Sequence, residues 1–261
     1  MAEPTRRYGE ARAEHGYRRG GGARFAVNLG WGLPGLEVLG PVSDVLVVVD
    51  VITFTTTLAV AMERGVRVYP CPWEEEQALA LAARTGASLA VGRSQVSLEH
   101  PYSLKPASLA RAPAGLSLVL PSPNGSALVA AAASFGVPVL AGSLRNAAAV
   151  ARVARRSGRV ITVIAAGERW AGEEADFALE DLLGAGAVID GIRRRRRSPE
   201  AAAAAAAFRH ARGQGLGRVL GQCVSGLEQA AKGHGDEVEW AAALNVSRRA
   251  PLLRGEYFEP G

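Results

Sequence analysis

Two short polar segments each follow an apolar run and precede an alanine-rich one, and their side chains could bind an anion. The first is Asp50-Val-Ile-Thr53-Phe-Thr55-Thr56-Thr57, and the second is Ser122-Pro-Asn124-Gly125-Ser126. An apolar run followed by an alanine-rich segment predicts a buried strand and then a helix. Hydroxyl groups and free backbone N–H groups at a helix start suit a phosphate or a sulfonate. The alternative is a tight turn at Asn124-Gly125, with Ser126 as a helix cap.

Three acidic residues could add catalysis to anion binding. Asp50 follows an apolar run directly, and a carboxylate in that place is costly unless it is paired or used. Asp50 could serve as a Mg²⁺ ligand or as a nucleophile. The alternative is a structural role, in which its carboxylate caps the helix or closes the turn. Glu180 and Asp181 lie in the first turns of a helix expected over 177–192, where acids stabilise the helix dipole. They could also complete a metal or acid–base site. We therefore predict Asp50, Glu180 and Asp181 as catalytic residues, with Asp50 and Asp181 as metal ligands.

Further anion ligands are expected at two other strand ends. Arg145 and Asn146 begin a helix expected over 142–154, and an arginine suits a planar anion, although a surface arginine is the alternative. Gly167-Glu168-Arg169 follows a third apolar run. The predicted substrate-binding residues are Thr53, Thr55, Thr56, Asn124, Gly125, Ser126, Arg145, Asn146, Glu168 and Arg169.

The elements that must position these residues alternate between strand and helix patterns. Strands are expected over 45–52, 66–71, 88–92, 116–121 and 160–166, with helices over 55–65 and 73–86 between the first three. Such alternation is typical of a largely parallel sheet with right-handed crossovers, in which ligands bind at the carboxyl ends of the strands. The fold class predicted is therefore α/β, a three-layer α/β/α arrangement.

The second half of this series resembles the first at a spacing of 71 residues. Val48 then matches Val119, and Thr55 matches Ser126. With four further residues inserted, "LAVGR" at 89–93 matches part of "VIAAGER" at 163–169. An internal duplication would give two similar lobes, about 42–112 and 113–261, although any two strand–helix–strand units share such a pattern.

Composition and charge bound the class of protein. The 261 residues are 48% hydrophobic and contain two cysteines, Cys71 and Cys223, whose spacing predicts free thiols. No apolar run approaches the roughly 18 residues of a membrane span, and the N-terminus lacks the apolar core of a secretion signal. We therefore expect a cytoplasmic protein without a membrane partner.

The net charge of +5 is concentrated in two places. Residues 1–24 carry six arginines and three glutamates and are expected to be disordered, because they contain few apolar residues. Arg193 to Arg197 form a second basic run, so the remainder of the chain is slightly acidic. A solvated loop is the expected role of that run, and a nucleic-acid partner using both clusters is the minority alternative.

Several of these segments together resemble one family, the 2-phosphosulfolactate phosphatases (the ComB family of coenzyme M biosynthesis). The matching pieces are "VVVDVITFTTTLAVAMERG", "VLPSPNGSALV", "GSLRNAAAVA", "AAGERW" and "FALEDLLGAGAVI". The resemblance implies one α/β phosphatase domain over 25–261, Mg²⁺ as cofactor, and a small phosphomonoester substrate that also carries sulfonate and carboxylate groups. It implies hydrolysis of 2-phosphosulfolactate to sulfolactate and phosphate.

Two departures from the family pattern concern substrate recognition. The family often has an arginine where this chain has Thr53, and a Ser-Pro where it has Lys105-Pro106. One anion partner is then lost, or Arg145 or Arg169 supplies it. The phosphatase class is thus better supported than this particular substrate.

Other functions remain open at this stage. The chain could be a phosphatase for a different phosphomonoester, or a homologue that binds a small anion without catalysis. A haloacid-dehalogenase-type phosphatase is disfavoured, because that family needs a second aspartate two residues after the first, and this chain has Ile52. No P-loop or G-x-G-x-x-G motif supports nucleotide binding. A homodimer is left open.

Overall fold

A computed structural model of the chain describes residues 25–168 and 177–260. The disorder expected for 1–24 lies outside the described residues. The strands are β1 Val27–Trp31, β2 Val45–Val49, β3 Arg67–Cys71, β4 Ser88–Leu89, β5 Ser117–Pro121, β6 Val139–Gly142, β7 Ile161–Ala165, β8 Pro251–Arg254 and β9 Tyr257–Pro260.

The helices of the first half are α2 Gly32–Leu39, α3 Phe54–Glu63, α4 Glu75–Thr85, α5 Pro106–Leu109 and α6 Gly125–Ala133. Those of the second half are α7 Ala147–Ser157, α8 Leu179–Gly191, α9 Pro199–Gln214, α10 Leu216–Gln222, α11 Val224–Ala231 and α12 Asp236–Ala242. Three short 3-10 helices lie at Gly40–Val42 (η1), Arg93–Gln95 (η2) and Leu144–Asn146 (η3).

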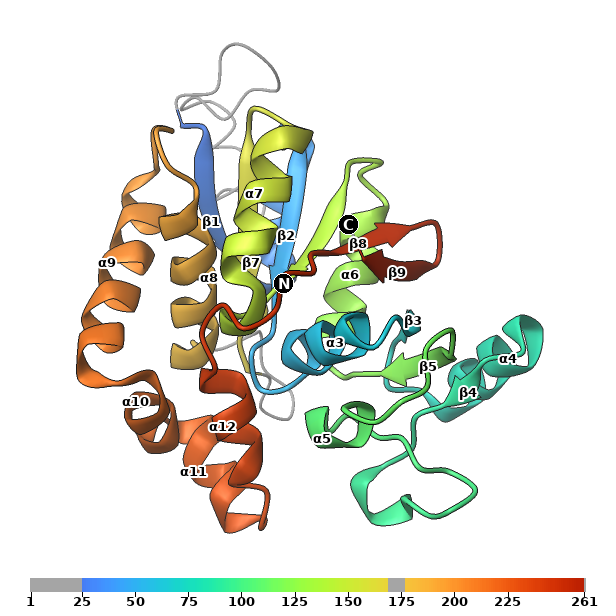
Figure 1. Cartoon of the computed structure of the whole chain (residues 1–261). Helices are drawn as coiled ribbons and strands as arrows, with labels where there is room; N and C mark the ends of the chain where they lie inside the picture. The colour runs from blue at the N-terminus through green and yellow to red at the C-terminus, as the bar shows by residue number, and fades with distance from the viewer. Residues whose placement is uncertain (1–24, 169–176, 261) are drawn as a thin grey trace, which may run out of the picture.

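The described strands form one sheet in the order β1-β7-β2-β6-β8-β9-β3-β5-β4. Its parallel pairings fall into two groups, β1-β7-β2-β6 and β3-β5-β4. The antiparallel hairpin β8–β9 lies between these groups and pairs with β6 on one side and β3 on the other (Figure 1). The predicted α/β class with a mostly parallel sheet is therefore confirmed.

Strand β2 shows why the sheet is covered on both faces. Alternate residues of a strand point to opposite faces, and every residue of this Val-rich strand is buried. Val45, Val47 and Val49 pack in a core with residues of α7, α8 and α9. Leu46 and Val48 pack in a second core with residues of α2, α3 and α6. Helices thus lie on both sides of this part of the sheet, which gives the three layers.

The order of the strands agrees with the 71-residue repeat. The order β7-β2-β6 in one group corresponds, unit for unit, to β4-β5-β3 in the other. The registers agree as well, since Ile164 pairs with Val48 and Leu89 pairs with Val119. Each sequence unit contributes strands to both groups, because α3 connects β2 to β3 and α6 connects β5 to β6. The segments 42–112 and 113–261 therefore do not form separate lobes in space.

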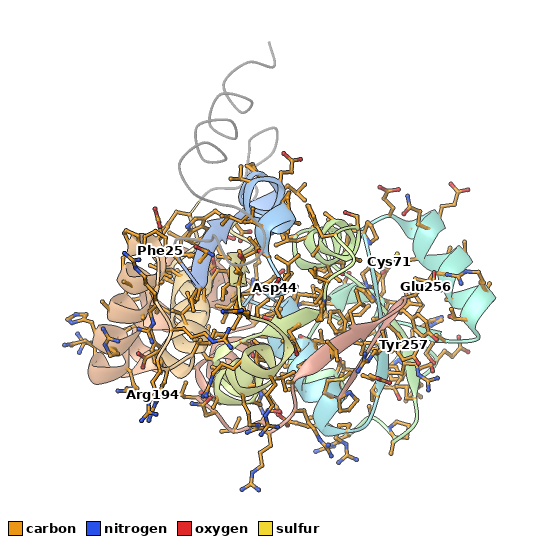
Figure 2. All side chains as sticks on the ribbon, turned by 90° about the horizontal axis from the view of Figure 1, so that it is seen from above. Phe25, Asp44, Cys71, Arg194, Glu256 and Tyr257 are labelled. Atoms are coloured by element: carbon orange, nitrogen blue, oxygen red, sulfur yellow. The ribbon has the colours of Figure 1, made fainter. Side chains whose placement is uncertain are left out.

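Two of the five arginines of the basic run bind carbonyl groups within the protein, and Arg193, Arg194 and Arg196 are exposed. Arg195 donates hydrogen bonds to the carbonyls of Arg155, Gly158 and Arg159 near the end of α7. Arg197 donates to the carbonyls of Ile189, Asp190 and Ile192 at the end of α8. Carbonyls at helix ends lack partners in their own helix, so these arginines cap α7 and α8. Arg194 lies at the rim of the molecule (Figure 2). The run thus combines exposed arginines, as expected for a solvated segment, with two arginines that serve the fold.

Two simpler expectations can also be compared with the structure. Cys71 and Cys223 are both buried free thiols, as predicted. No helix within the described ranges combines the length and the hydropathy that crossing a membrane requires.

Candidate active site

The two polar corners predicted from the sequence meet in space. Gly125 begins α6, and a Cβ atom built on it would lie 2.6 Å from Oδ2 of Asp50 and 2.4 Å from Cδ1 of Phe54. Only glycine leaves room for that approach. The carboxyl ends of β2 and β5 therefore converge, and Asp50 lies between the starts of α3 and α6.

Backbone N–H groups from both corners hold the Asp50 carboxylate. The N–H of Phe54 donates to Oδ1 at 3.3 Å, and the N–H of Gly125 also donates to this carboxylate. Thr55, predicted as a substrate ligand, instead closes the turn. Its hydroxyl donates to the Asp50 carbonyl at 2.6 Å and accepts the Asp50 N–H at 3.2 Å. Its observed contacts are therefore structural.

The other threonines of this corner differ in their partners. The Thr57 hydroxyl donates to the Leu104 carbonyl at 3.1 Å. Thr53 accepts a 3.4 Å hydrogen bond from Arg93. The Thr56 hydroxyl is buried and has no partner among the described residues. An orphaned buried hydroxyl in the first turn of a helix supports the prediction that this corner holds an anion.

The corner after β5 corrects one helix assignment. The N-cap of α6 is Asn124, not Ser126, and no side-chain hydrogen bond caps the helix. The Ser126 hydroxyl donates to the Leu120 carbonyl at 3.3 Å, so it stabilises the strand end rather than the helix start. The half-buried Asn124 amide thus stays available to a ligand, whereas Ser126 already has a partner within the fold.

Asp181 joins two strand ends. Its Oδ1 accepts the Val51 N–H at 2.7 Å, and its Oδ2 accepts the Gly167 N–H at 2.9 Å. These bonds tie the loops after β2 and β7 to the first turn of α8. With each oxygen already bonded to a backbone amide, Asp181 serves as a clamp in this structure.

The carboxyl group of Asp50 interacts electrostatically with three others, those of Glu168, Glu180 and Asp181. Burial raises the pKa of Asp50 to about 6, and Glu180 adds to the rise, while the N–H groups of Phe54 and Gly125 oppose it. Burial, together with Asp50 and Glu180, raises the pKa of Glu168 to about 7. Burial and the same two acids raise the pKa of Asp181 well above its usual range. The site is thus acidic, and its like charges need compensation.

The donor set fits a divalent cation in its chemistry. Asp50, Glu180 and Asp181 make no ion pair with a lysine or arginine in the described part of the chain. Mg²⁺ is commonly held by one or two carboxylates, with water and phosphate oxygens completing its shell. Within 25–168 and 177–260, no group of three His, Cys, Asp or Glu side chains is assembled as a metal centre. Asp50 accepts the Phe54 N–H at 3.3 Å, and Glu180 accepts the Cys223 thiol at 3.5 Å. Both bonds are longer than the 2.7 and 2.9 Å bonds to Asp181, so Asp50 and Glu180 are the candidate ligands.

Glu180 also contacts a thiol. Cys223 donates a 3.5 Å hydrogen bond from Sγ to Oε2 of Glu180. Burial, with the Glu180 charge second, raises the pKa of this thiol to about 11. Cys223 is therefore a neutral neighbour of the acids at neutral pH.

Arg145 and Asn146 have partners within the protein. The Arg145 guanidinium donates to both carboxylate oxygens of Glu63, at 3.1 and 3.3 Å, and lies 5.2 Å from the Trp240 ring centroid. Asn146 accepts the Ser143 N–H at 2.8 Å and donates to the Ala141 carbonyl. The planar anion that Arg145 meets is thus Glu63, although its buried Nε has no partner among the described residues. The prediction for Arg169 lies outside the described residues.

Sequence reasoning missed Arg93 and Lys232. Arg93 contacts Thr53, at the corner for which Arg145 or Arg169 was expected to supply a cation. Lys232 is the residue that follows α11. Its positive charge is close enough to Glu168 to oppose the rise of the Glu168 pKa. The match of "LAVGR" with "VIAAGER" could have identified Arg93, because it places Arg93 opposite Glu168 in the repeat.

Two comparisons with known proteins match the part of the chain that contains this site. Residues 36–256 match the sequence model of the family described as 2-phosphosulpholactate phosphatase. The chain is also 28% identical over 203 residues to a protein of Carboxydothermus hydrogenoformans named "Probable 2-phosphosulfolactate phosphatase". That alignment covers 77% of this chain and 82% of the relative.

Proposed function

The chain belongs to the 2-phosphosulpholactate phosphatase family and is a phosphoric monoester hydrolase, and we propose that it converts 2-phosphosulfolactate to sulfolactate and phosphate with Mg²⁺. The name of the Carboxydothermus relative agrees with this substrate. Mg²⁺ is proposed because Asp50, Glu180 and Asp181 make no ion pair with a lysine or arginine in the described part of the chain.

The observation that carries the proposal is the meeting of the two corners at Asp50. A carboxylate that binds cations lies there between two helix starts that favour anions. A phosphate ester bound with a divalent cation has both charges that this arrangement accommodates. A simple anion-binding protein would gain nothing from the acids, which repel an anion.

The residues of the site have three different proposed roles. Asp50 and Glu180 would hold Mg²⁺, which supplies positive charge for the phosphoryl oxygens and orients the ester. The Asn124 amide and the Thr56 hydroxyl would donate to the remaining oxygens. Asp181 keeps the loops after β2 and β7 in place through its two backbone bonds.

Glu168 is the group best suited to move a proton. With a pKa raised to about 7, its carboxyl group is partly protonated near neutral pH. A general acid or base works best when its pKa lies near the working pH. Glu168 would thus accept a proton from the attacking water or donate one to the departing alkoxide oxygen.

Hydrolysis of a panel of esters tests this function. Released phosphate is measured with 2-phosphosulfolactate, 2-phosphoglycolate and ethyl phosphate, with Mg²⁺ and with a chelator. We expect turnover of 2-phosphosulfolactate to be fastest and to disappear without the divalent cation. Saturable binding without phosphate release would instead indicate a non-catalytic anion binder, and faster turnover of another ester would reassign the substrate.

A further inference from the structure

Arg93 and Glu237 form a fixed ion pair beside the corner after β2. Nε of Arg93 donates to Oε1 of Glu237 at 2.9 Å, and Nη2 donates to Oε2 at 2.7 Å. The Glu237 side chain is fully buried, whereas 29% of the Arg93 side chain is exposed. Two parallel bonds to a buried carboxylate fix the plane of a guanidinium group. The pair connects η2, which follows β4, to α12.

The bonds to Glu237 leave the outer edge of the guanidinium available. A guanidinium group has five N–H donors. In Arg93, the N–H of Nε and one N–H of Nη2 donate to Glu237. A further bond, from Nη2 to the Thr53 hydroxyl, is long at 3.4 Å. Within the described ranges, Nη1 makes no hydrogen bond. An arginine that is held by a buried carboxylate, keeps 29% of its side chain exposed and lies next to Thr53 is suited to binding a ligand.

We propose that Arg93 binds the carboxylate of the substrate, and that Glu237 is a positioning residue that orients it. The outer Nη1–Nη2 edge can bind a carboxylate through two parallel N–H···O bonds, and the phosphate is already assigned to Asn124, Thr56 and the cation. This inference rests on the proposed function, because it assigns to Arg93 the acidic group that is not hydrolysed. Arg93 thereby becomes a specificity residue for phosphate esters of 2-hydroxy acids.

The internal repeat supports this division of charge. The registers of β4 and β7 place Arg93 at the position equivalent to Glu168. One copy of the loop after the strand thus adds a carboxylate to the acidic cluster, and the other adds a guanidinium beside Thr53. Because the two corners meet at Asp50, a substrate bound there lies between both loops.

A second arginine–glutamate pair serves as a matched control. Arg84 of α4 donates to both carboxylate oxygens of Glu256, at 2.8 and 2.7 Å. Both side chains are more than half exposed, and Glu256 lies in the turn of the β8–β9 hairpin (Figure 2). This pair is also bidentate, although Arg84 uses Nη1 and Nη2 where Arg93 uses Nε and Nη2, and it lies away from the corners.

The test compares two esters that differ only by a carboxylate, 2-phosphoglycolate and ethyl phosphate. The readout is the ratio of kcat/KM for the first ester to that for the second. Arg93→Gln should lower this ratio by about 10- to 100-fold through the KM for 2-phosphoglycolate, as expected for a lost charged hydrogen bond. Arg93→Lys keeps the charge but loses the planar pair of donors, so its ratio should lie between the ratio of the wild type and that of Arg93→Gln. Arg84→Gln should leave the ratio at the wild-type value.

Glu237→Gln tests the positioning role. It should raise the KM for 2-phosphoglycolate more than it changes kcat, because Arg93 keeps its charge but loses its orientation. Arg93→Gln leaves the buried carboxylate of Glu237 without its partner, which can prevent folding. The double variant Arg93→Gln/Glu237→Gln removes both charges and avoids this problem. It should show the same lowered ratio as Arg93→Gln.

Outcomes that contradict the inference differ from those that contradict the function. An unchanged ratio in a folded Arg93→Gln protein would assign Arg93 a structural role, even if hydrolysis is intact. If the wild type hydrolyses no ester, the same ratio is taken from dissociation constants measured by calorimetry. A lowered binding ratio would then support Arg93 while overturning the hydrolase proposal, and failure to bind 2-phosphoglycolate would overturn both.

Discussion

The corner after β2 and the corner after β5 are equivalent in the repeat but differ in chemistry. Thr55 and Ser126 occupy matching positions, and each hydroxyl donates to a carbonyl near the end of its own strand. Phe54 and Gly125 also match, and they meet where the corners touch. Asp50, by contrast, matches Pro121, so only the first corner carries an acid.

The difference shows which features serve the fold and which serve the reaction. Features present in both corners, such as the hydroxyl bonded to the strand end, close the turn. Features present in one corner, such as Asp50, give that corner its chemistry. Asn124 opposite Thr53, and Arg93 opposite Glu168, extend the same asymmetry to the loops around the site. We therefore expect substitutions at shared features to change stability and substitutions at unshared features to change kinetics.

The largest effect is expected from removing the unshared acid. Asp50→Asn deletes a charge but keeps the shape, and should lower kcat/KM by about a thousand-fold while the protein stays folded. The measurement is phosphate release at saturating Mg²⁺, with circular dichroism to check the fold.

Asp44 offers a control at the other end of β2. Its Oδ2 accepts the N–H groups of Arg159 and Val160, both at 2.9 Å. Asp44→Asn should lower stability by about 1 kcal/mol and leave kcat/KM within about twofold of wild type. Turnover near the wild-type value in Asp50→Asn would remove the acid from the mechanism.

The next effect concerns stability against pH in the protein kept free of metal with a chelator. Burial raises the pKa of Asp50 from 3.8 to about 6, so the folded state binds this proton more tightly than the unfolded chain does. The favourable contribution is complete below about pH 4 and is lost as pH rises through about 6. The loss amounts to about 3 kcal/mol at 1.36 kcal/mol per pKa unit.

Urea unfolding of wild type and Asp50→Asn isolates this contribution. The free energy of unfolding of the variant, relative to wild type, should rise by about 3 kcal/mol between pH 4 and pH 7. Millimolar Mg²⁺ should reduce that difference, because it stabilises the charged carboxylate of the wild type only. A difference that does not vary with pH would show that Asp50 is charged at low pH and already compensated.

The sequence predicted the local elements well because their signals are local. The apolar runs at 45–49 and 117–121, and Gly65 and Gly86 after α3 and α4, mark strands and helix ends within a few residues. The hairpin β8–β9 was missed, since its strands have four residues each and are stabilised by pairing with β6 and β3. The helices α9 to α12 were likewise not assigned individually.

The contacts of the candidate site could be predicted only in part, for the same reason. The repeat and the strand ends pointed to Asp50 and Asn124 as candidate residues, because their places depend only on position along the chain. Arg93 and Glu237 are 144 residues apart, and nothing in the local pattern of either indicates the other. Arg145 was expected to bind substrate. Its partner within the fold, Glu63, lies 82 residues away, so the local sequence around Arg145 does not reveal the pair. A side chain's partner decides its role, and distant partners follow from the fold.

The smallest effects should separate Asn124 from Ser126, which the sequence suggested would act alike. Ser126→Ala removes a bond to the Leu120 carbonyl and should lower stability by about 1 kcal/mol, with little change in kcat/KM. Thr55→Ala, its equivalent, should behave the same way. Asn124→Ala removes a side chain that makes no capping bond, so it should leave stability within about 0.5 kcal/mol.

For Asn124→Ala we expect kcat/KM to fall about 10- to 100-fold, near the effect of losing one donor to a phosphoryl oxygen. Thermal unfolding and phosphate release measured on the same three variants decide the question. If Asn124→Ala lost stability and kept its turnover, Asn124 would serve the turn, and the two corners would then differ only at Asp50. A large kinetic loss in Ser126→Ala would mean instead that its hydroxyl leaves Leu120 for the substrate. Shared features would then no longer identify structural roles.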